Sequence, residues 1–548
     1  MSWIDTLNEF DTYEAALNGF SMELPDDYNV AADCIRKHDN LDRTALYQAY
    51  PDGRRETYSF RDLDRMSDKL ANALADDGIE AGDRVVVYLP QVPETLCMHL
   101  ACWKHGALSV PVNSSADSIY IRQIAEDCDP KIIITTDKLI DTVIEVTESC
   151  QSIERFVLVG EDDDHDTSIP VTPYEEFVKN KSSSFEIIDS TPETPANIMY
   201  TSGSSGPPKG AVLCHGTWLR RLPSFYINNE FTVDADSVGY HYRIWGTTTA
   251  LENIVLTMWH HGGAVVGYQD DSIGPERVIE FLAEFDVTHT FMVPSWIRKM
   301  MAVEDPDTYD LSLDVITVGS ERLTPEIVDW VDTHLDGVTV NEIYGLTETG
   351  ALLTDCQTWY EQRHGFAGKP IPGQGVAIID TESGEEKPRG RTGAIAVRDE
   401  GVSSLLLEYW DLPEATTKLK RVDNWVLTGD LGLHTEDGYI RVFGRNDDLV
   451  VSSGYRISPD EIESVLTQHE AVAEVGVIID TDEDLGDIIK AFVELRPSAE
   501  PTTTLEAELK QWVMNRLEIY KSPDIVIFRS SIPTTDRGKI DRDALGEK

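Results

Sequence analysis

Basic residues are scarce in this sequence. Its 98 aspartates and glutamates face only 46 lysines and arginines, which gives a formal net charge of −52 over 548 residues. Nucleic-acid binding requires a basic surface that neutralises phosphates, so this balance argues against nucleic acids and anionic membranes as partners. The acidic residues are spread along the chain instead of forming a tail, and high salt would screen their mutual repulsion. The composition predicts a protein adapted to a salt-rich cytoplasm, with an ordinary acidic protein as the alternative.

Cysteine pairs, a signal segment and long apolar runs are also missing. The seven cysteines form no CxxC pair, which argues against a disulfide framework and a cysteine zinc site. The first residues contain no basic segment followed by an apolar run, so we expect no signal peptide. The longest apolar stretches are interrupted by polar residues such as Glu252 and Asn253, so we expect no membrane span. The adjacent His260 and His261 lack the i, i+4 spacing of helical zinc ligands. We therefore expect a cytoplasmic protein.

Short β-branched runs alternate with amphipathic stretches over residues 57–160 and again over residues 262–344. This alternation is typical of parallel sheets covered by helices, so we predict an α/β fold. In the first stretch the expected strands are residues 84–89, 108–112, 131–136 and 155–160, and the expected helices are residues 94–104 and 118–127.

The last hundred residues show a different pattern of expected helices and strands. A helix is expected to begin at Ser458, with Pro459 in its first turn, because serine caps helices well and proline is tolerated there. Strands are expected at residues 474–479, 489–495 and 524–528, with a helix at 505–517. We therefore predict a large N-terminal domain of stacked, mostly parallel sheets (residues 1–446) and a small α+β C-terminal domain (residues 447–548).

A loop rich in glycine and hydroxyl side chains follows an expected strand at residues 196–200. It contains Thr201-Ser202-Gly203-Ser204-Ser205-Gly206-Pro207-Pro208-Lys209-Gly210. The glycines let backbone amides face an anion, the hydroxyls add donors and Lys209 adds a positive charge, which suits a polyphosphate. Two prolines precede Lys209, so this is not a Walker A loop. Taken alone, such a segment is more often a flexible surface loop.

Three further segments carry side chains suited to nucleotide chemistry. In Tyr344-Gly345-Leu346-Thr347-Glu348 a carboxylate stands beside a hydroxyl, which suits a magnesium ion already bound to phosphates, although a helix cap would look the same. Asp430 can accept both hydroxyls of a ribose and Arg445 can reach sugar or phosphate, although two β-turns with a surface ion pair are the plain alternative. Lys539, between Gly538 and Ile540, would ordinarily be solvated.

In this order the motifs resemble those of the adenylate-forming superfamily, which includes acyl-CoA synthetases, firefly luciferase and nonribosomal-peptide adenylation domains. The matching segments are Thr201–Gly210, Tyr344–Glu348, Gly365 with Gly368-Lys369-Pro370, Thr428–Asp430 with Gly444–Asp448, Gly454–Glu463 and Gly538–Ile540. Ser204 and Ser205 replace the usual threonines, and Arg537 replaces a usual serine. The chain looks closest to medium-chain or butyryl-type acyl-CoA synthetases, and its acidity resembles that of haloarchaeal proteins.

The resemblance implies an AMP-forming acyl-CoA synthetase that uses ATP, Mg²⁺ and coenzyme A. Lys539, Thr347 and Glu348 would be catalytic, with Glu348 as the metal ligand. The implied ATP- and AMP-binding residues are Thr201, Ser202, Gly203, Ser204, Ser205, Gly206, Lys209, Gly319, Ser320, Glu321, Arg322, Tyr344, Gly345, Thr347, Asp430, Arg445 and Lys539.

The resemblance also implies a mobile small domain. Family members rotate this domain between two half-reactions about an acidic hinge residue, here Asp447. The rotation would bring a coenzyme A-binding segment to the site, with residues Ser453, Gly454, Tyr455 and Arg456.

For the acyl group the resemblance implies a pocket lined by Trp245, Gly246, Gly345 and Leu346, although a tryptophan such as Trp245 is as often plain core. Acetate-specific relatives carry tryptophan at the position of Gly345, so we expect a larger short- to medium-chain or aryl acid. Two alternatives are a ligase that loads a carrier protein and an inactive nucleotide-binding sensor. A homo-oligomer is compatible with the sequence.

Overall fold

The computed structural model describes residues 3–146, 150–160, 165–201, 207–270, 273–304, 306–398, 405–419, 424–445, 450–452, 455–457, 459–482, 486–496, 499–517, 521–534 and 540–546. The chain forms two compact units. The first comprises residues 1–376 and 397–426, and the second comprises residues 377–396 and 427–548. The predicted boundary at Asp447 lies outside the described residues and stays a prediction.

The first unit contains a nine-stranded sheet in the order β16-β15-β14-β13-β12-β10-β11-β1-β2. Neighbouring strands from β1 to β14 pair in parallel, while β2, β15 and β16 are antiparallel additions at the two edges. Its strands are β1 (Thr44–Ala49), β2 (Arg55–Ser59), β10 (Val238–His241), β11 (Ala264–Tyr268), β12 (His289–Met292), β13 (Val315–Val318), β14 (Thr339–Leu346), β15 (Gly350–Thr354) and β16 (Lys369–Pro370).

An eight-stranded sheet in the order β19-β9-β8-β4-β3-β5-β6-β7 completes the sheets of this unit. Strands β8 to β7 pair in parallel, and β9 and β19 pair antiparallel at one edge. Its strands are β3 (Arg84–Val87), β4 (Leu108–Pro111), β5 (Ile132–Thr136), β6 (Arg155–Val159), β7 (Val171–Pro173), β8 (Pro195–Thr201), β9 (Lys209–Cys214) and β19 (Glu408–Tyr409). One apolar core contains residues of both sheets, such as Leu46 and Val265 of one and Val85 and Ile132 of the other. The predicted parallel α/β architecture is confirmed.

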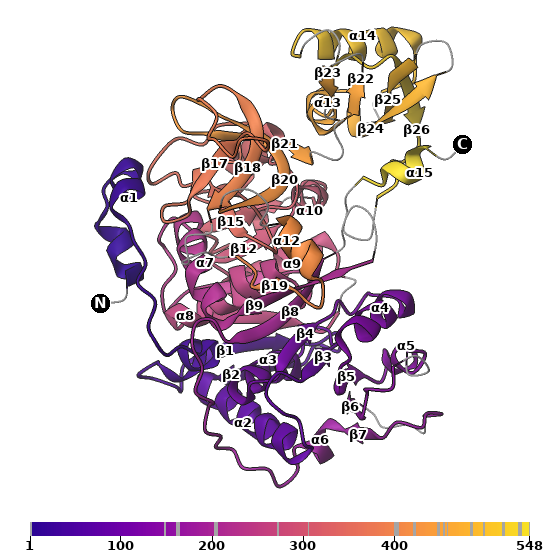
Figure 1. Cartoon of the computed structure of the whole chain (residues 1–548). Helices are drawn as coiled ribbons and strands as arrows, with labels where there is room; N and C mark the ends of the chain where they lie inside the picture. Colours follow the sequence, from indigo (N-terminus) through magenta and orange to yellow (C-terminus); the bar gives the residue numbers. More distant parts are fainter. Residues whose placement is uncertain are drawn as a thin grey trace. The chain divides into compact units, whose positions relative to one another are not determined.

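Helices α2 and α3 pack side by side in this unit (Figure 1). Ser59 and Asp62 form a reciprocal capping box at the start of α2, and Gly106 ends α3 with a φ of 94°, where glycine is favoured. The helices are α1 (Tyr13–Gly19), α2 (Phe60–Asp76), α3 (Pro93–His105), α4 (Ser118–Cys128), α5 (Ile140–Ile144), α6 (Tyr174–Phe177), α7 (His215–Asn228), α8 (Thr257–His261), α9 (Pro275–Glu284), α10 (Pro294–Met300), α11 (Pro325–His334), α12 (Pro413–Leu419), the 3₁₀-helices η1 (Trp3–Glu9) and η4 (Pro306–Thr308), and the π-helices η2 (Ala32–Arg36) and η3 (Thr249–Leu256).

Helix α7 is buried along its whole length. All 14 of its residues are buried, and it contacts β14 and β15 of the larger sheet as well as β9 of the other sheet. Polar side chains on such a helix require partners inside the protein because burial without hydrogen bonds is unfavourable. Helix α7 carries two arginines, Arg220 and Arg221, in this environment.

The second unit contains the four-stranded sheet β17-β18-β20-β21, the antiparallel pair β22-β23 and the three-stranded sheet β24-β25-β26. Helices α13 and α14 pack against each other. Their apolar residues share a small core with those of β24, β25 and β26. The elements are β17 (Val376–Ile379), β18 (Thr392–Arg398), β20 (Trp425–His434), β21 (Ile440–Arg445), β22 (Val450–Ser452), β23 (Tyr455–Ile457), β24 (Val472–Asp482), β25 (Gly486–Leu495), β26 (Ile525–Arg529), α13 (Pro459–Leu466), α14 (Thr503–Met514) and α15 (Arg542–Gly546). The α+β character expected of the last hundred residues is present.

Among the described residues, no helix combines the length and the apolar character needed to cross a lipid bilayer.

Candidate active site

The glycine- and hydroxyl-rich segment connects the two strands of a β-hairpin. Strands β8 and β9 pair antiparallel, so Thr201 at the start of the loop lies opposite Lys209 at its end. Gly210 must be small here, because a Cβ would lie 2.6 Å from Cγ2 of Ile198. Residues Ser202, Gly203, Ser204, Ser205 and Gly206, between the two strands, lie outside the described residues.

The carboxylate of Glu348 meets the base of this loop. The Thr201 hydroxyl donates a hydrogen bond of 3.3 Å to Oε1 of Glu348, which is 147 residues away in the sequence. The Tyr409 hydroxyl donates a second bond to the same oxygen at 2.8 Å. The ammonium of Lys209 lies 5.5 Å from the centre of the Tyr409 ring, within cation–π range. The loop motif that begins at Thr201 and the Tyr344–Glu348 motif thus meet at the half-buried carboxylate of Glu348.

Thr347 and Glu348 lie in the turn between the antiparallel strands β14 and β15. They do not cap a helix, so the helix-cap alternative is wrong. The N–H of Leu406 donates to the backbone carbonyl of Glu348 at 2.8 Å, and the N–H of Thr349 donates to the carbonyl of Leu346 at 3.2 Å. The turn is therefore held by backbone contacts on either side of the carboxylate.

Gly345 has a structural reason for lacking a side chain. It lies at a register shift in the β14–β15 hairpin, and a Cβ there would overlap the carbonyl oxygen of Gly350. A tryptophan at this position would require a different hairpin backbone. Packing accounts for this glycine, and the acyl-pocket assignment of Gly345 and of its half-buried neighbour Leu346 stays a prediction.

Other predicted residues follow parallel strands of the nine-stranded sheet at the carboxyl edge where ligands of α/β folds usually bind. Gly319, Ser320, Glu321 and Arg322 come directly after β13, and Ser320 has a φ of 68°. Ser295, after β12, donates through its N–H and its hydroxyl to the Glu321 carboxylate at 2.8 and 2.7 Å. This bidentate contact fixes the segment that was predicted to contact adenine.

Trp245 and Gly246 come from the segment after β10, at the same edge. The Trp245 side chain is fully buried, and its ring lies against Gly267 of β11. This is the environment of a core residue, which was the alternative for Trp245. Gly246 is half-buried beside the Val112 carbonyl. The acyl-pocket assignment of both residues stays a prediction.

Glu342 on β14, two residues before Tyr344, forms a buried carboxyl pair with Asp355, which follows β15. Burial and the neighbouring Asp355 raise the pKa of Glu342 to about 8, and burial raises the pKa of Asp355 to about 7. The N–H of Leu323 donates to the Glu342 carboxylate at 3.1 Å, which ties β14 to the Gly319–Arg322 segment. Gln362 donates to Asp355 at 2.8 Å. The pair thus connects two predicted nucleotide-binding segments, the one at Tyr344 and the one at residues 319–322.

The second unit carries the remaining predicted residues. Asp430 on β20 is buried and lies opposite Arg445 on β21, so the strand pairing brings these two predicted residues together. Tyr455 and Arg456 lie on β23. Thr534 and Ile540 pair across the base of the segment that contains Lys539. Lys539, the hinge residue Asp447, Ser453 and Gly454 lie outside the described residues.

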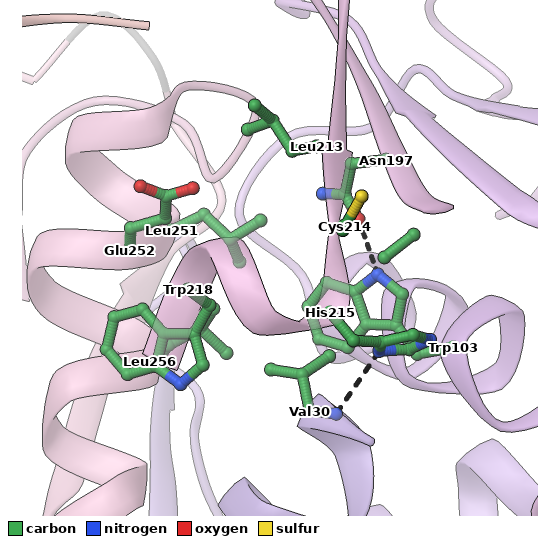
Figure 2. A pocket seen from close by; sticks show the side chains of 11 residues that line it. Val30, Trp103, Asn197, Leu213, Cys214, His215, Trp218, Leu251, Glu252 and Leu256 are labelled. Atoms are coloured by element: carbon green, nitrogen blue, oxygen red, sulfur yellow. Dashed lines mark hydrogen bonds between the residues drawn. The ribbon is translucent and has the colours of Figure 1, made fainter. Parts of the chain in front are cut away.

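A small cavity lies inside the first unit, beside α7 and η3. Figure 2 shows Glu252 at one side of it and His215 and Trp103 at the other. Its volume of about 20 Å³ suits one water molecule and is too small for an acyl chain. The His215 Nδ1 accepts a hydrogen bond from the Val30 N–H, and burial lowers the pKa of this histidine to about 4, so it is neutral at physiological pH. The cavity is part of the scaffold.

Four residues near Glu348 and Glu321 were missed by sequence reasoning: Tyr409, Ser295, Arg221 and Glu252. Tyr409 and Ser295 lie in segments without an obvious polar pattern. Arg221 and Glu252 form a buried ion pair of 2.9 Å, although each looks like an ordinary surface charge in the sequence. No local pattern could have identified these contacts, because the partners are distant in the chain.

The comparisons with known proteins agree on one family. Residues 35–410 match the model of the AMP-binding enzymes, and residues 461–539 match that of the AMP-binding enzyme C-terminal domain. The mouse mitochondrial acyl-coenzyme A synthetase ACSM3 is 29% identical over 99% of this chain and 94% of that protein. An acetyl-coenzyme A synthetase of Bacillus subtilis is 29% identical over 94% of this chain and 90% of that protein.

The fold has solved counterparts. The anthranilate CoA ligase AuaEII, in a crystal structure with anthranoyl-AMP, superposes with a TM-score of 0.85 over 96% of this chain and 98% of that one, at 24% identity. The family match covers well over half of the chain. This protein therefore belongs to the family of AMP-binding enzymes.

Proposed function

We propose that this protein is an AMP-forming acyl-CoA synthetase. A carboxylate oxygen of the acid attacks the α-phosphorus of ATP, pyrophosphate leaves, and an acyl-adenylate forms. The sulfur of coenzyme A then attacks the acyl carbon, its proton goes to solvent, and AMP leaves with the former carboxylate oxygen. Support comes from the family match and from relatives named acyl- and acetyl-coenzyme A synthetases.

One observation carries the proposal: Thr201 donates to Glu348 across 147 residues of sequence. This contact joins the start of a loop suited to phosphates to a carboxylate suited to a phosphate-bound metal ion. Because the substrate supplies its own nucleophile, the protein needs only to position the reactants and to neutralise developing charge.

We assign the ATP contacts by segment. The phosphates would lie against Thr201, Lys209 and the loop between them, and Thr347 would contact the α-phosphate. Adenine would lie against residues 319–322 and Tyr344. Asp430 and Arg445 would hold the ribose, since a carboxylate can accept both of its hydroxyls.

We propose that Glu348 is a protein ligand of Mg²⁺. Magnesium prefers oxygen ligands and takes few from the protein when it also binds substrate phosphates. The Glu348 carboxylate and the Thr201 hydroxyl supply such oxygens, and among the described ranges no group of three or more His, Cys, Asp or Glu side chains could hold a metal ion. This donor set fits an ion held mainly by phosphates. When bound, the ion would neutralise charge on the triphosphate.

Lys539 would bridge the substrate carboxylate and the α-phosphate in the first step. The thiol of coenzyme A needs the same space in the second step, so we propose that the small domain, residues 447–548, moves about Asp447. Ser453, Gly454, Tyr455 and Arg456 would then contact coenzyme A, with Arg456 facing a phosphate.

For the acid we propose a short- to medium-chain or aryl carboxylate. The rings of Tyr242 and Trp296, after β10 and β12, stack 4.5 Å apart at the carboxyl edge of the larger sheet. Flat aromatic surfaces at this edge favour an apolar or aromatic acyl group.

We also propose that the protein works in a salt-rich cytoplasm. The support is the net charge of −52, whose self-repulsion is relieved when salt shortens the screening length.

The test is an assay of AMP release in molar KCl with acids from acetate to octanoate and phenylacetate, with and without coenzyme A. We expect coenzyme A-dependent AMP release with at least one acid larger than acetate. Turnover only with an added carrier protein would favour carrier loading, and nucleotide binding without turnover of any acid would favour a sensor.

A further inference from the structure

Arg221 lies in the middle of α7, and every other residue of this helix is also buried. Its side chain is only 1% exposed. The guanidinium Nη2 donates to the backbone carbonyl of Thr347 at 2.7 Å. This carbonyl belongs to the peptide that joins Thr347 to Glu348, so a fixed charge on a central helix holds the backbone immediately before the carboxylate.

Glu252 holds the other side of the guanidinium. Nη1 of Arg221 donates to both oxygens of Glu252, at 3.1 and 2.9 Å. Glu252 lies on the π-helix η3, its side chain is 7% exposed, and it borders the small cavity beside His215 (Figure 2). The ion pair is therefore anchored in two buried helices.

The turn is built around this arginine. Gly350, after the turn, has a φ of 69°, and a Cβ there would lie 2.6 Å from Nε and 2.9 Å from Cδ of Arg221. The absence of a side chain at Gly350 lets Arg221 pass along the backbone to reach Thr347. The Leu406 N–H holds the carbonyl of the next residue, Glu348, and the hydroxyls of Thr201 and Tyr409 hold its carboxylate. Arg221 and Leu406 thus hold the backbone carbonyls of Thr347 and Glu348, and Thr201 and Tyr409 hold the Glu348 carboxylate.

We propose that Arg221 and Glu252 are positioning residues for the metal-binding carboxylate. The inference rests on the proposed function, because it assumes that Glu348 holds Mg²⁺ on ATP. The planar guanidinium contacts Glu252 and the Thr347 carbonyl at the same time, and Glu252 fixes its orientation. Without this pair, the Thr347–Glu348 peptide can rotate, and Glu348 binds the ion in a less favourable geometry.

Lysine cannot replace this arginine. An ammonium group is compact, and it lacks the rigid fork that joins two acceptors at fixed angles. Arg221→Lys therefore keeps the charge and loses the simultaneous contact. Glu252→Gln keeps the size and an acceptor oxygen, and it removes the charge that orients the guanidinium.

The chain offers a matched control for the cost of disturbing a buried ion pair. Lys104 is completely buried and pairs with Asp64 at 2.6 Å and Asp68 at 2.8 Å in the same unit. The described contacts of its ammonium group are with Asp64, Ser67 and Asp68, none of which lies in the β14–β15 turn. Lys104→Met should lower the free energy of unfolding without affecting metal binding.

The experiment measures ATP binding by calorimetry as a function of Mg²⁺, together with amide hydrogen exchange of residues 346–349, at a temperature where every variant is folded. Removing an outer partner of a metal ligand typically costs about 10- to 100-fold in metal affinity, and we expect this loss in Arg221→Lys and Glu252→Gln. Their ATP affinity should fall more in the presence of Mg²⁺ than in its absence, because the Glu348 carboxylate acts through the metal ion. Exchange at residues 346–349 should be faster in both variants and unchanged in Lys104→Met.

Two results would overturn the inference. One is a wild-type Mg²⁺ dependence in both Arg221→Lys and Glu252→Gln; the other is an equal shift in Lys104→Met, which would mean general destabilisation. Glu348→Gln separates this from the proposed function. If Glu348→Gln loses the Mg²⁺ dependence and the arginine variant keeps it, only the positioning role fails. If Glu348→Gln also keeps it, the metal role of Glu348 in the proposed function fails, and the positioning role fails with it.

Discussion

The buried carboxyl pair of Glu342 and Asp355 should make the stability of the protein depend on pH. Burial beside Asp355 raises the pKa of Glu342 from its ordinary 4.5 to about 8. Between these two pH values the unfolded chain has released this proton and the folded protein retains it, so the folded state holds one more proton. The stabilising contribution of this proton is complete below the unfolded pKa and is lost as the pH rises through the folded pKa. The glutamine side chain in Glu342→Gln cannot ionise, so this variant should not lose this stabilising contribution as the pH rises.

The size of the effect follows from the shift. One pKa unit corresponds to about 1.4 kcal/mol, so the free energy of unfolding of the wild type should fall by about 3 kcal/mol more than that of Glu342→Gln between about pH 5.5 and about pH 9. The measurement is urea unfolding in molar KCl at a series of pH values. Groups whose pKa values the substitution leaves unchanged contribute equally to both proteins. Their contributions therefore cancel when the two free energies of unfolding are subtracted. Parallel pH profiles for the two proteins would refute the assignment.

Three further predictions concern the proposed site and the charge. Lys539→Ala should slow formation of the acyl-adenylate by at least ~100-fold, the scale of losing a preorganised donor, while thioester formation from supplied acyl-adenylate persists; equal loss of both steps would contradict its role. Gly345→Ala should lower the free energy of unfolding by about 1–3 kcal/mol, because its Cβ overlaps the Gly350 carbonyl, and an unchanged urea midpoint would contradict the hairpin geometry. Raising KCl from the millimolar to the molar range should increase the unfolding temperature, because the acidic residues are then screened; a flat response would contradict the proposed adaptation to salt.

The helices and strands for which bounds were predicted follow from local rules. The expected strand at residues 131–136 is β5 (Ile132–Thr136), and the expected helix at residues 118–127 is α4 (Ser118–Cys128). Apolar runs, turn residues and caps lie within a few positions of each other, so the sequence carries this information directly. The small unit follows the same rules, as α14 (Thr503–Met514) illustrates.

Contacts between distant segments could not be predicted from local rules. The Thr347-Glu348 pair is compatible with a helix cap or a hairpin turn, and only pairing with β15 decides between them. Arg221 and Glu252 look like surface charges, and their burial becomes visible only when α7 and η3 are packed. The convergence of Thr201 with Glu348 was expected from the family resemblance, whereas the Tyr409 hydroxyl on the same carboxylate was not.

The central chemical claim is that the acid's own carboxylate attacks the α-phosphorus of ATP. The most direct test is turnover of an acid labelled with ¹⁸O in its carboxylate, in the presence of ATP, Mg²⁺ and coenzyme A, followed by mass spectrometry of the products. We predict one ¹⁸O atom in each AMP formed and none in the pyrophosphate. Label in inorganic phosphate with formation of ADP, or unlabelled AMP, would contradict the account.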